Sequence, residues 1–561
     1  MTCKEKILSN DYADIIITNI QPDEVELLNN VDYCASTIDD EFNIVYVSRQ
    51  GIPETSIGAY TYAAIPDLYG LMQTFQAENL VAMGNIRIQN PPLSLHGRDV
   101  IIGFIDTGIR YQLDVFRDSE GNSRILSIWD QTIQSGEPPE GFLYGTEYTR
   151  DEINNALNAE NPLDVVPSTD ENGHGTAMAS AAAGSIIDQG LTFRGAAPQA
   201  DIVMVKVKGA KEYLREYYLI NDDAVAFQEN DIMEAVKYLD NLSNIYQKPV
   251  VIVLGIGTNL GNHRGDSPLG DYINKISTQR RRAIVVCGGN EGDKQHHYSG
   301  NVPDQVEIQV QEGTTGFHME LWGCKMDEYN VAVRTPGGEI TPVIDFRNGV
   351  DRSFSFLFDR TLINISIVLV EPRSGEQLVF FRFRNPTPGI WSILVSPSEQ
   401  KRLRGNGNFS IWLPITEFID GGVVFLEPDP EVTLTEPANV ERVISVSAYD
   451  GYSGGWFFES GRGFTGSGTV KPDLSAPGVR VSTALGERTG SSMAAALSAG
   501  CIAQFMEWAI VEGNAPMVEG RTIKGYFIRG AVRENNIIYP DPRWGYGKLN
   551  INDTFEVLAR I

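Results

Sequence analysis

Four short runs of almost uninterrupted apolar residues constrain the fold more than any other feature of the chain. Longer stretches separate them, and residues 232–242 show apolar residues at helical spacing of three and four. Runs without polar alternation are typical of strands covered on both faces. Their alternation with helices predicts an α/β fold with a parallel sheet flanked by helices. The four runs are residues 100–105, 202–207, 250–254 and 283–287.

Three segments that lie far apart in the chain each carry one member of a Ser/His/Asp set. Asp106 directly follows the first apolar run, His174 stands between two glycines, and Ser492 opens a run of small residues. A serine hydroxyl becomes a good nucleophile when an imidazole takes its proton and a buried carboxylate orients that imidazole. Functional groups in parallel α/β folds gather beyond the carboxyl ends of the strands, which is where Asp106 is expected.

The surroundings of these residues resemble the signature blocks of subtilisin-like serine proteases. The order Asp, His, Ser along the chain is the order found in subtilisin. The resemblance implies that Asp106, His174 and Ser492 form a catalytic triad. Ser491 is a competing nucleophile, but the family motif places the reactive serine directly before the methionine. The similar blocks are residues 104–108, 172–176, 285–292, 471–478 and 490–494.

The same resemblance implies the rest of the active site. Asn290 would hold the oxyanion with its side-chain amide, together with the main-chain N–H of Ser492 at the start of a helix. An edge strand that pairs with the substrate main chain, and forms one wall of the primary specificity pocket, falls at Leu254, Gly255, Ile256 and Gly257. We expect Gly288 and Gly289 to line the other wall of this pocket.

Two further units are predicted outside the parallel-sheet pattern. Residues 12–19 and 42–48 alternate apolar and polar positions, which predicts a small α+β unit where subtilisin-like enzymes carry a prodomain. Short strands recur between turns rich in Pro, Gly and Asn after about residue 303, which predicts an inserted all-β jelly-roll sandwich. The expected domains are the prodomain (1–62), the first part of the catalytic domain (63–302), the insertion (303–435) and the second part of the catalytic domain (436–561).

The composition changes at residues 58–66, where small and aromatic residues lead into a proline. We expect the chain to cut itself within or near this stretch. An uncleaved linker is the alternative. The expected cleavage region is Ala59, Tyr60, Thr61 and Tyr62.

The short prodomain, the insertion between Asn290 and Ser492 and the absence of a recognisable secretion signal together resemble the Csp germination proteases of spore-forming clostridia. That resemblance implies a serine endopeptidase that activates a spore cortex-lytic enzyme precursor by limited proteolysis during germination. It implies three partners: the precursor, the chain's own prodomain, which stays bound after cleavage, and other Csp proteins. It also implies synthesis in the cytoplasm and packaging in the spore. Two alternatives remain open: a non-catalytic regulator or scaffold of the Csp type, and an intracellular housekeeping subtilisin-like protease.

Charge and cysteine usage restrict the other partners. The net charge of −28 argues against nucleic acid, and no stretch approaches 18 uninterrupted apolar residues, so membrane insertion is not expected. Five scattered cysteines without a CxxC pair predict neither a disulfide framework nor a zinc site, and they fit a reducing compartment. Calcium is common in subtilisin-like enzymes and stays an open alternative, but no EF-hand loop or other dense carboxylate spacing supports it, so we expect no cofactor and no metal.

Overall fold

The computed structural model describes residues 1–18, 32–72, 83–188, 192–344, 350–398 and 405–560. The apolar runs form neighbouring strands of one eight-stranded sheet, so the predicted parallel sheet is confirmed. The strands are β5 (Ile101–Asp106), β6 (Ile125–Asp130), β7 (Thr146–Thr149), β10 (Asp201–Lys206), β12 (Val250–Leu254), β14 (Arg282–Cys287), β25 (Ile444–Tyr449) and β26 (Leu474–Pro477). Their order is β26-β25-β14-β12-β5-β10-β6-β7, and neighbours run parallel except for the pair β6 and β7.

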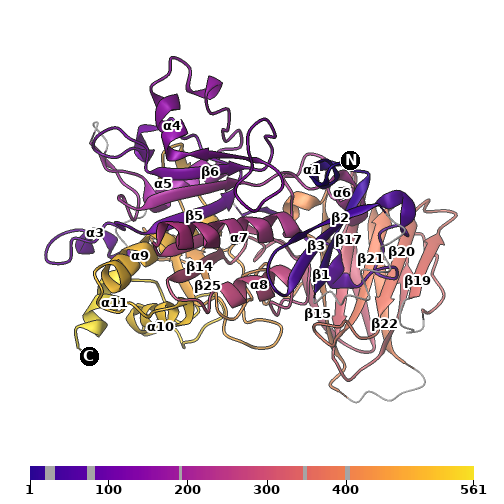
Figure 1. Cartoon of the computed structure of the whole chain (residues 1–561). Coiled ribbons are helices and arrows are strands. Elements are labelled where there is room, and N and C mark those ends of the chain that lie inside the picture. The colour runs from indigo at the N-terminus through magenta and orange to yellow at the C-terminus, as the bar shows by residue number, and fades with distance from the viewer. Residues whose placement is uncertain (19–31, 73–82, 189–191, 345–349, 399–404, 561) are drawn as a thin grey trace.

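Helices cover both faces of this sheet (Figure 1). Side chains alternate along β5: Ile102 and Phe104 join the core with α5 (His174–Ala183) and α9 (Ser491–Met506), whereas Ile101 and Ile105 join the opposite core. That second core contains α7 (Glu229–Tyr246) and α8 (Pro268–Ile276). The other helices are α3 (Asn85–Ile88), α4 (Arg150–Leu157), α6 (Glu212–Tyr218), α10 (Gly520–Gly530) and α11 (Ile551–Leu558), and short strand pairs are β8 (Ile187–Asp188) with β9 (Thr192–Phe193) and β27 (Val481–Thr483) with β28 (Gly486–Arg488).

The helical stretch Ser491–Val511 is long and apolar enough to cross a membrane by length and composition alone. Within its most apolar window, 83% of the residues are buried inside the fold. Its small residues allow it to lie close against α5 and against the strands of the parallel sheet. The apolar character of this stretch is therefore explained by its place in the core.

The N-terminal residues form a small unit of their own on the α7 side of the sheet (Figure 1, indigo). It contains α1 (Cys3–Leu8) and an antiparallel sheet in the order β1-β3-β2, made of β1 (Tyr12–Thr18), β2 (Tyr33–Thr37) and β3 (Phe42–Ser48). The predicted strands at residues 12–19 and 42–48 are β1 and β3. A buried carboxylate, Asp14, ties the unit to the sheet domain: it pairs with Lys211 and accepts hydrogen bonds from Gln228 (2.9 Å) and Asn230 (3.2 Å).

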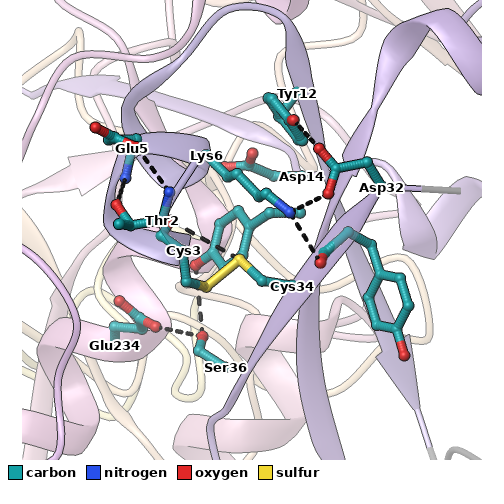
Figure 2. The surroundings of a disulfide bond; sticks show 12 residues. Thr2, Cys3, Glu5, Lys6, Tyr12, Asp14, Asp32, Cys34, Ser36 and Glu234 are labelled. Atoms are coloured by element: carbon teal, nitrogen blue, oxygen red, sulfur yellow. Dashed lines mark hydrogen bonds and ion pairs between the residues drawn. A yellow bond between two sulfur atoms is a disulfide. The ribbon is translucent and has the colours of Figure 1, made fainter.

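A disulfide joins Cys3 of α1 to Cys34 of β2 (Figure 2). The expectation that the cysteines form no disulfide is wrong for this pair. The two residues are 31 positions apart in sequence, and they meet because α1 packs against β2. Close to the bridge, Ser36 donates a hydrogen bond of 2.7 Å to Glu234 of α7 (Figure 2). Cys287, Cys324 and Cys501 are free.

The predicted all-β insertion is present as two antiparallel sheets around one apolar core, drawn in salmon and orange at the right of Figure 1. Its strands are β15 (His297–Asn301), β16 (Asp304–Val310), β17 (Gly316–Gly323), β18 (Tyr329–Arg334), β19 (Val350–Ser355), β20 (Leu362–Val368), β21 (Gln377–Arg384), β22 (Gly389–Pro397), β23 (Asn408–Trp412) and β24 (Val423–Phe425). The sheet orders are β15-β23-β17-β21-β20-β19 and β18-β22-β16-β24. β15 belongs to the insertion because it pairs with β23. The insertion therefore begins before the expected boundary at residue 303. The jelly-roll connectivity stays a prediction.

Candidate active site

Asp106, His174 and Ser492 meet at the carboxyl end of the parallel sheet. His174 Nδ1 lies 2.8 Å and 2.9 Å from the two carboxylate oxygens of Asp106, and His174 Nε2 lies 3.1 Å from Ser492 Oγ. All three side chains are buried. Because an ionised carboxylate only accepts hydrogen bonds, Nδ1 carries the proton of the neutral ring. Nε2 is then free to accept the proton of the serine hydroxyl.

Local glycines let these residues approach one another. His174 is the first residue of α5, and the preceding Gly173 has φ 90°, a conformation that favours glycine. A Cβ on Gly175 would lie 2.3 Å from the carbonyl oxygen of Gly108, so only glycine lets α5 begin this close to Asp106. The main-chain N–H of Thr107 donates a 2.7 Å hydrogen bond to Asp106. The sequence around each catalytic candidate is therefore explained by close packing.

Asp170 is a positioning residue that the sequence analysis missed. One of its carboxylate oxygens accepts from the N–H of Gly173 (2.7 Å) and from the hydroxyl of Thr107 (2.8 Å). The other accepts from the N–H (2.8 Å) and the hydroxyl (2.6 Å) of Thr176. These contacts satisfy free donors at the start of α5 and join that helix to the residue after Asp106. An aspartate three residues before Gly173, ahead of a helix, is the sequence signal that could have identified it.

Asn290 lies beside the start of α9 with its amide free. Its Oδ1 accepts a hydrogen bond of 3.0 Å from the N–H of Ser491, whereas its buried Nδ2 has no partner among the described residues. An unpaired buried donor next to a nucleophile fits an oxyanion hole, because the donor gains its partner when charge develops on the substrate oxygen. The hydroxyl of Ser491 also lacks a hydrogen-bond partner in the described part of the chain, so the imidazole contacts Ser492 rather than Ser491.

A segment of the chain itself occupies the cleft in front of Ser492. β4 (Leu68–Leu71) lies between β11 (Phe227–Gln228) and β13 (Ile256–Gly257) and runs antiparallel to both. The next residue, Met72, donates its N–H to the carbonyl oxygen of Gly255 (3.1 Å) and accepts a hydrogen bond on its own carbonyl oxygen from the N–H of Ser492 (3.4 Å). This is the arrangement of a peptide bound as a substrate strand.

The segment expected to bind substrate therefore contacts β4. Leu71 pairs with Ile256, and Gly70 pairs with Gly257. A Cβ on Gly255 would lie 2.2 Å from Met178 Sδ and 3.0 Å from His174 Cε1, so a side chain there would clash with Met178 and press against the imidazole. Leu254 is the last residue of β12 and is fully buried.

Gly288 and Gly289 lie close to Leu434 and Thr435. Cβ atoms on these glycines would contact Leu434 (3.1 Å) and Thr435 (2.6 Å), respectively. The N–H of Thr435 donates to the carbonyl oxygen of Gly288 (3.3 Å). Their role as the second wall of the specificity pocket stays a prediction.

The residues expected to hold the cleavage site lie elsewhere. Tyr62 packs edge-to-face on Trp322 of the insertion, with ring centroids 5.4 Å apart, and donates to Glu320 (3.2 Å). Tyr60 donates its hydroxyl to the carbonyl oxygen of Pro53 (3.0 Å). The segment that reaches Ser492 is the later stretch from Leu68 to Met72, and cleavage within or near Ala59, Tyr60, Thr61 and Tyr62 stays a prediction.

Buried carboxylates lie just upstream of this strand. The N–H of Asp67 donates to Glu229 (3.4 Å), and the N–H of Glu229 donates to the carbonyl oxygen of Asp67 (2.9 Å). Burial, followed by the proximity of Glu229, Glu320 and Glu436, raises the pKa of Asp67 well above its usual value. Burial also raises the pKa of Glu229 to about 7 and that of Glu436 to about 8. Burial in the fold therefore favours the protonated, neutral form of these carboxyl groups.

The remaining histidines are held by structural contacts. His263 and His297 both stack on Trp412, and burial lowers the pKa of each, to about 3 and about 4. His296 Nδ1 lies 2.7 Å from Glu291. Among the described residues no group of three or more His, Cys, Asp or Glu is arranged to hold a metal ion.

The subtilase family profile matches residues 97–316 and 405–547, more than half of the chain. The chain belongs to the subtilase family. The matched ranges contain the strand that ends at Asp106, the start of α5, Asn290 and the start of α9. They exclude much of the inserted sandwich and the N-terminal unit. The resemblance inferred from the five sequence blocks is confirmed.

Among solved structures, the chain is similar to the CspB protease of Clostridium perfringens. It is 30% identical to this chain, has a TM-score of 0.75, and the match covers 86% of this chain and 99% of that one. Subtilisin-like proteases SBT3.6 and SBT3.5 of Arabidopsis thaliana are 28% identical over 250 residues and 30% identical over 217 residues. Those matches cover 41% and 35% of this chain and span 30% and 26% of the plant proteins.

Proposed function

We propose that this chain is a serine endopeptidase that first cuts its own N-terminal region and then cuts a protein substrate. The observation that carries the proposal is the position of Met72. Its carbonyl oxygen accepts a hydrogen bond from the N–H of Ser492, and its N–H donates to Gly255, so its carbonyl carbon is presented to the hydroxyl that His174 can deprotonate. The bond assigned for self-cleavage is therefore Met72–Gln73, of which Gln73 lies outside the described residues.

The proposed mechanism follows from the contacts of the four residues. Ser492 Oγ attacks the carbonyl carbon of Met72 while His174 Nε2 takes the proton, and Asp106 stabilises the positive imidazolium. The developing oxyanion gains a second hydrogen bond from the unpaired Nδ2 of Asn290. His174 then gives the proton to the leaving amine, and water hydrolyses the acyl-enzyme by the reverse sequence of proton transfers.

For the later substrate we propose a spore cortex-lytic enzyme precursor, activated by limited proteolysis during germination. The similarity to the clostridial CspB protease over 86% of this chain supports this choice. The same proposal includes other Csp proteins as partners, cytoplasmic synthesis and packaging in the spore. Incubating the purified protein with such a precursor tests it: one discrete product supports the germination role, whereas unspecific degradation or no product favours a housekeeping protease.

Self-cleavage is tested by expressing the wild type and Ser492→Ala. The wild type should yield a fragment of residues 1–72, and the variant should remain a single chain of 61.9 kDa. Intact-mass spectrometry identifies the bond, including when the new N-terminal glutamine cyclises. Cleavage at another bond would contradict the assignment of Met72, and identical uncut chains would contradict the protease proposal.

The occupied cleft also favours a second candidate function, a regulator whose triad stays covered. Tyr69 and Leu68 are fully buried, and Met72 is 1% exposed, so this strand shields Ser492 from other substrates while it remains in place. Unprocessed wild-type chains that bind a precursor without cutting it would support this candidate over the first.

A further inference from the structure

The inserted sandwich covers the strand that occupies the active-site cleft. Residues 413–418, between β23 and β24, are called the roof segment below. A Cβ on Gly70 would lie 2.5 Å from Ile415 Cδ1 and 3.2 Å from Phe418 Cε1. Ile415 is 0% and Phe418 is 2% exposed, so neither side chain borders open solvent. Gly70 is the third residue before the bond assigned for self-cleavage, counting Met72 as the first.

The roof segment is held in place at three points. The side-chain amide of Asn259 donates to the carbonyl oxygen of Leu413 (3.1 Å), and the N–H of Asn221 donates to the carbonyl oxygen of Phe418 (3.0 Å). Between these points, one oxygen of Glu291 accepts from both the N–H and the hydroxyl of Thr416, each at 3.1 Å.

Glu291 is itself fixed on its other side. Its second carboxylate oxygen is 2.7 Å from His296 Nδ1, and the residue directly follows Asn290. The roof is thus anchored to the same short segment that carries the oxyanion donor. A shift of the roof away from Gly70 would break these hydrogen bonds, of which the one from Asn259 to Leu413 is buried and costly to leave unmade.

The strand below the roof has little freedom to retreat. Gly70 pairs with Gly257, and a Cβ on Gly257 would lie 2.3 Å from Thr435 Oγ1, so that strand is also closely packed. On the other edge, Tyr69 pairs with Phe227. Lowering the strand would also break the two main-chain hydrogen bonds of Met72, which set the reacting carbonyl against Ser492.

We propose that the roof segment closes the subsite for the third residue before the cleaved bond, so that this protease selects substrates with glycine at that position. Ile415 and Phe418 are then specificity-determining residues. The inference rests on the proposed protease function and names its substrate class: extended segments with glycine third before the cut and apolar residues around it, as Tyr69, Leu71 and Met72 are in this chain.

The test measures self-cleavage of the full chain after Gly70→Ala and Gly70→Val. Overpacking a closely packed site predicts that alanine slows release of the 1–72 fragment by about 5- to 150-fold, and that valine slows it further. Adding Ile415→Ala to Gly70→Ala removes the atom that the new methyl group would meet, and the rate should return most of the way to that of the wild type. Gly209→Ala is the matched control, because a Cβ on Gly209 meets no atom within 4 Å.

The outcomes separate this inference from the proposed function. Wild-type cleavage after Met72 together with an unchanged rate in Gly70→Ala would overturn the closed subsite and leave the protease function standing. Failure of Ile415→Ala to restore the rate, in a double variant that melts cooperatively, would also overturn it. No cleavage in wild type and Ser492→Ala alike would overturn the protease function, and the subsite with it. If Gly70→Val does not fold, the comparison of Gly70→Ala with its Ile415→Ala partner decides.

Discussion

The N–H of Ser492 donates a 3.4 Å hydrogen bond to the carbonyl oxygen of Met72. The two residues are 420 positions apart in sequence, and the fold brings them together. That contact holds the Met72 carbonyl group beside the residue whose hydroxyl contacts His174. A peptide held this way loses little further freedom on the way to the transition state, because its entropy of orientation has already been lost on folding. Under the proposed function, the uncut chain is therefore arranged for a single intramolecular cut.

Removing the side-chain amide of Asn290 should slow that cut without changing the fold. Asn290→Ala deletes the unpaired Nδ2 that faces the developing oxyanion, and loss of one such donor in subtilisin lowers turnover by roughly 100- to 1000-fold. The measurement is the rate of appearance of the 1–72 fragment by intact mass. Asn439→Ala, which removes another buried asparagine bonded to Leu434, is the control and should keep a rate within a few-fold of the wild type. Equal rates in both variants would remove Asn290 from the oxyanion hole.

Replacing Asp170 should weaken the fold and the active site together. Asp170→Ala leaves four donors at the start of α5 without their acceptor, and buried unsatisfied donors cost roughly 1–3 kcal/mol each. We expect the free energy of unfolding in urea to fall by at least about 3 kcal/mol, and self-cleavage to slow because His174 is the first residue of that helix. The exposed Asp164→Ala should change stability by less than about 0.5 kcal/mol. A fully stable Asp170→Ala would contradict its positioning role.

The sequence predicted the triad because its information is local. Each of Asp106, His174 and Ser492 lies at the end of a strand or the start of a helix, and the small residues that the packing requires stand directly beside it. Parallel strands then bring those ends to one edge of the sheet. Asn290 could be singled out as a candidate for the same reason, since its strand and glycines are adjacent in sequence, and its role in the oxyanion hole stays a prediction.

The strand in the cleft could not be identified in the same way. Apart from Gly70, Leu68 to Met72 carry no turn residue, charge or alternation that marks a cleavage site, and their extended form depends on pairing with β11 and β13. The local composition indicated the stretch around Tyr62 instead. The aromatic ring of Tyr62 packs against Trp322 of the insertion. Tertiary pairing, which leaves no local sequence pattern, decided which segment reached Ser492.

The disulfide between Cys3 and Cys34 could not be predicted from the sequence for a related reason. An odd number of scattered cysteines carries no information on which two residues the packing of α1 on β2 will bring together.

Thiol titration of the denatured, unreduced protein should give three thiols rather than five. The double variant Cys3→Ala and Cys34→Ala should lower the free energy of unfolding by about 2–4 kcal/mol, because the unfolded chain gains freedom. Five reactive thiols in protein prepared under oxidising conditions would contradict the bridge.

The buried carboxylates beside the strand should make its docking depend on pH. Burial raises the folded-state pKa of Glu229 to about 7 and that of Glu436 to about 8, and it raises that of Asp67 as well. In the unfolded chain these groups titrate near 4–4.5. Between those values the folded protein binds protons that the unfolded chain has lost, so stability falls as pH rises. The stabilisation is complete below about pH 4 and is lost by about pH 8.

The expected fall in stability with rising pH can be measured on Ser492→Ala, which avoids self-cleavage during equilibration. Its urea midpoint should fall from pH 5 to pH 8, and adding Glu229→Gln should flatten that dependence, because glutamine has no titrating proton. The glutamine oxygen can accept from only one of the two N–H groups, of Leu269 and Asp67, that Glu229 binds, so the variant is compared by the slope of its pH dependence. Asp222→Asn, at an exposed position, should leave the dependence unchanged. In the processed wild type, the 1–72 fragment should dissociate faster at pH 8 than at pH 5, since ionised Asp67 and Glu229 repel each other across the contact that holds the strand. A dissociation rate that is constant or decreases with pH would show that these carboxylates do not control release.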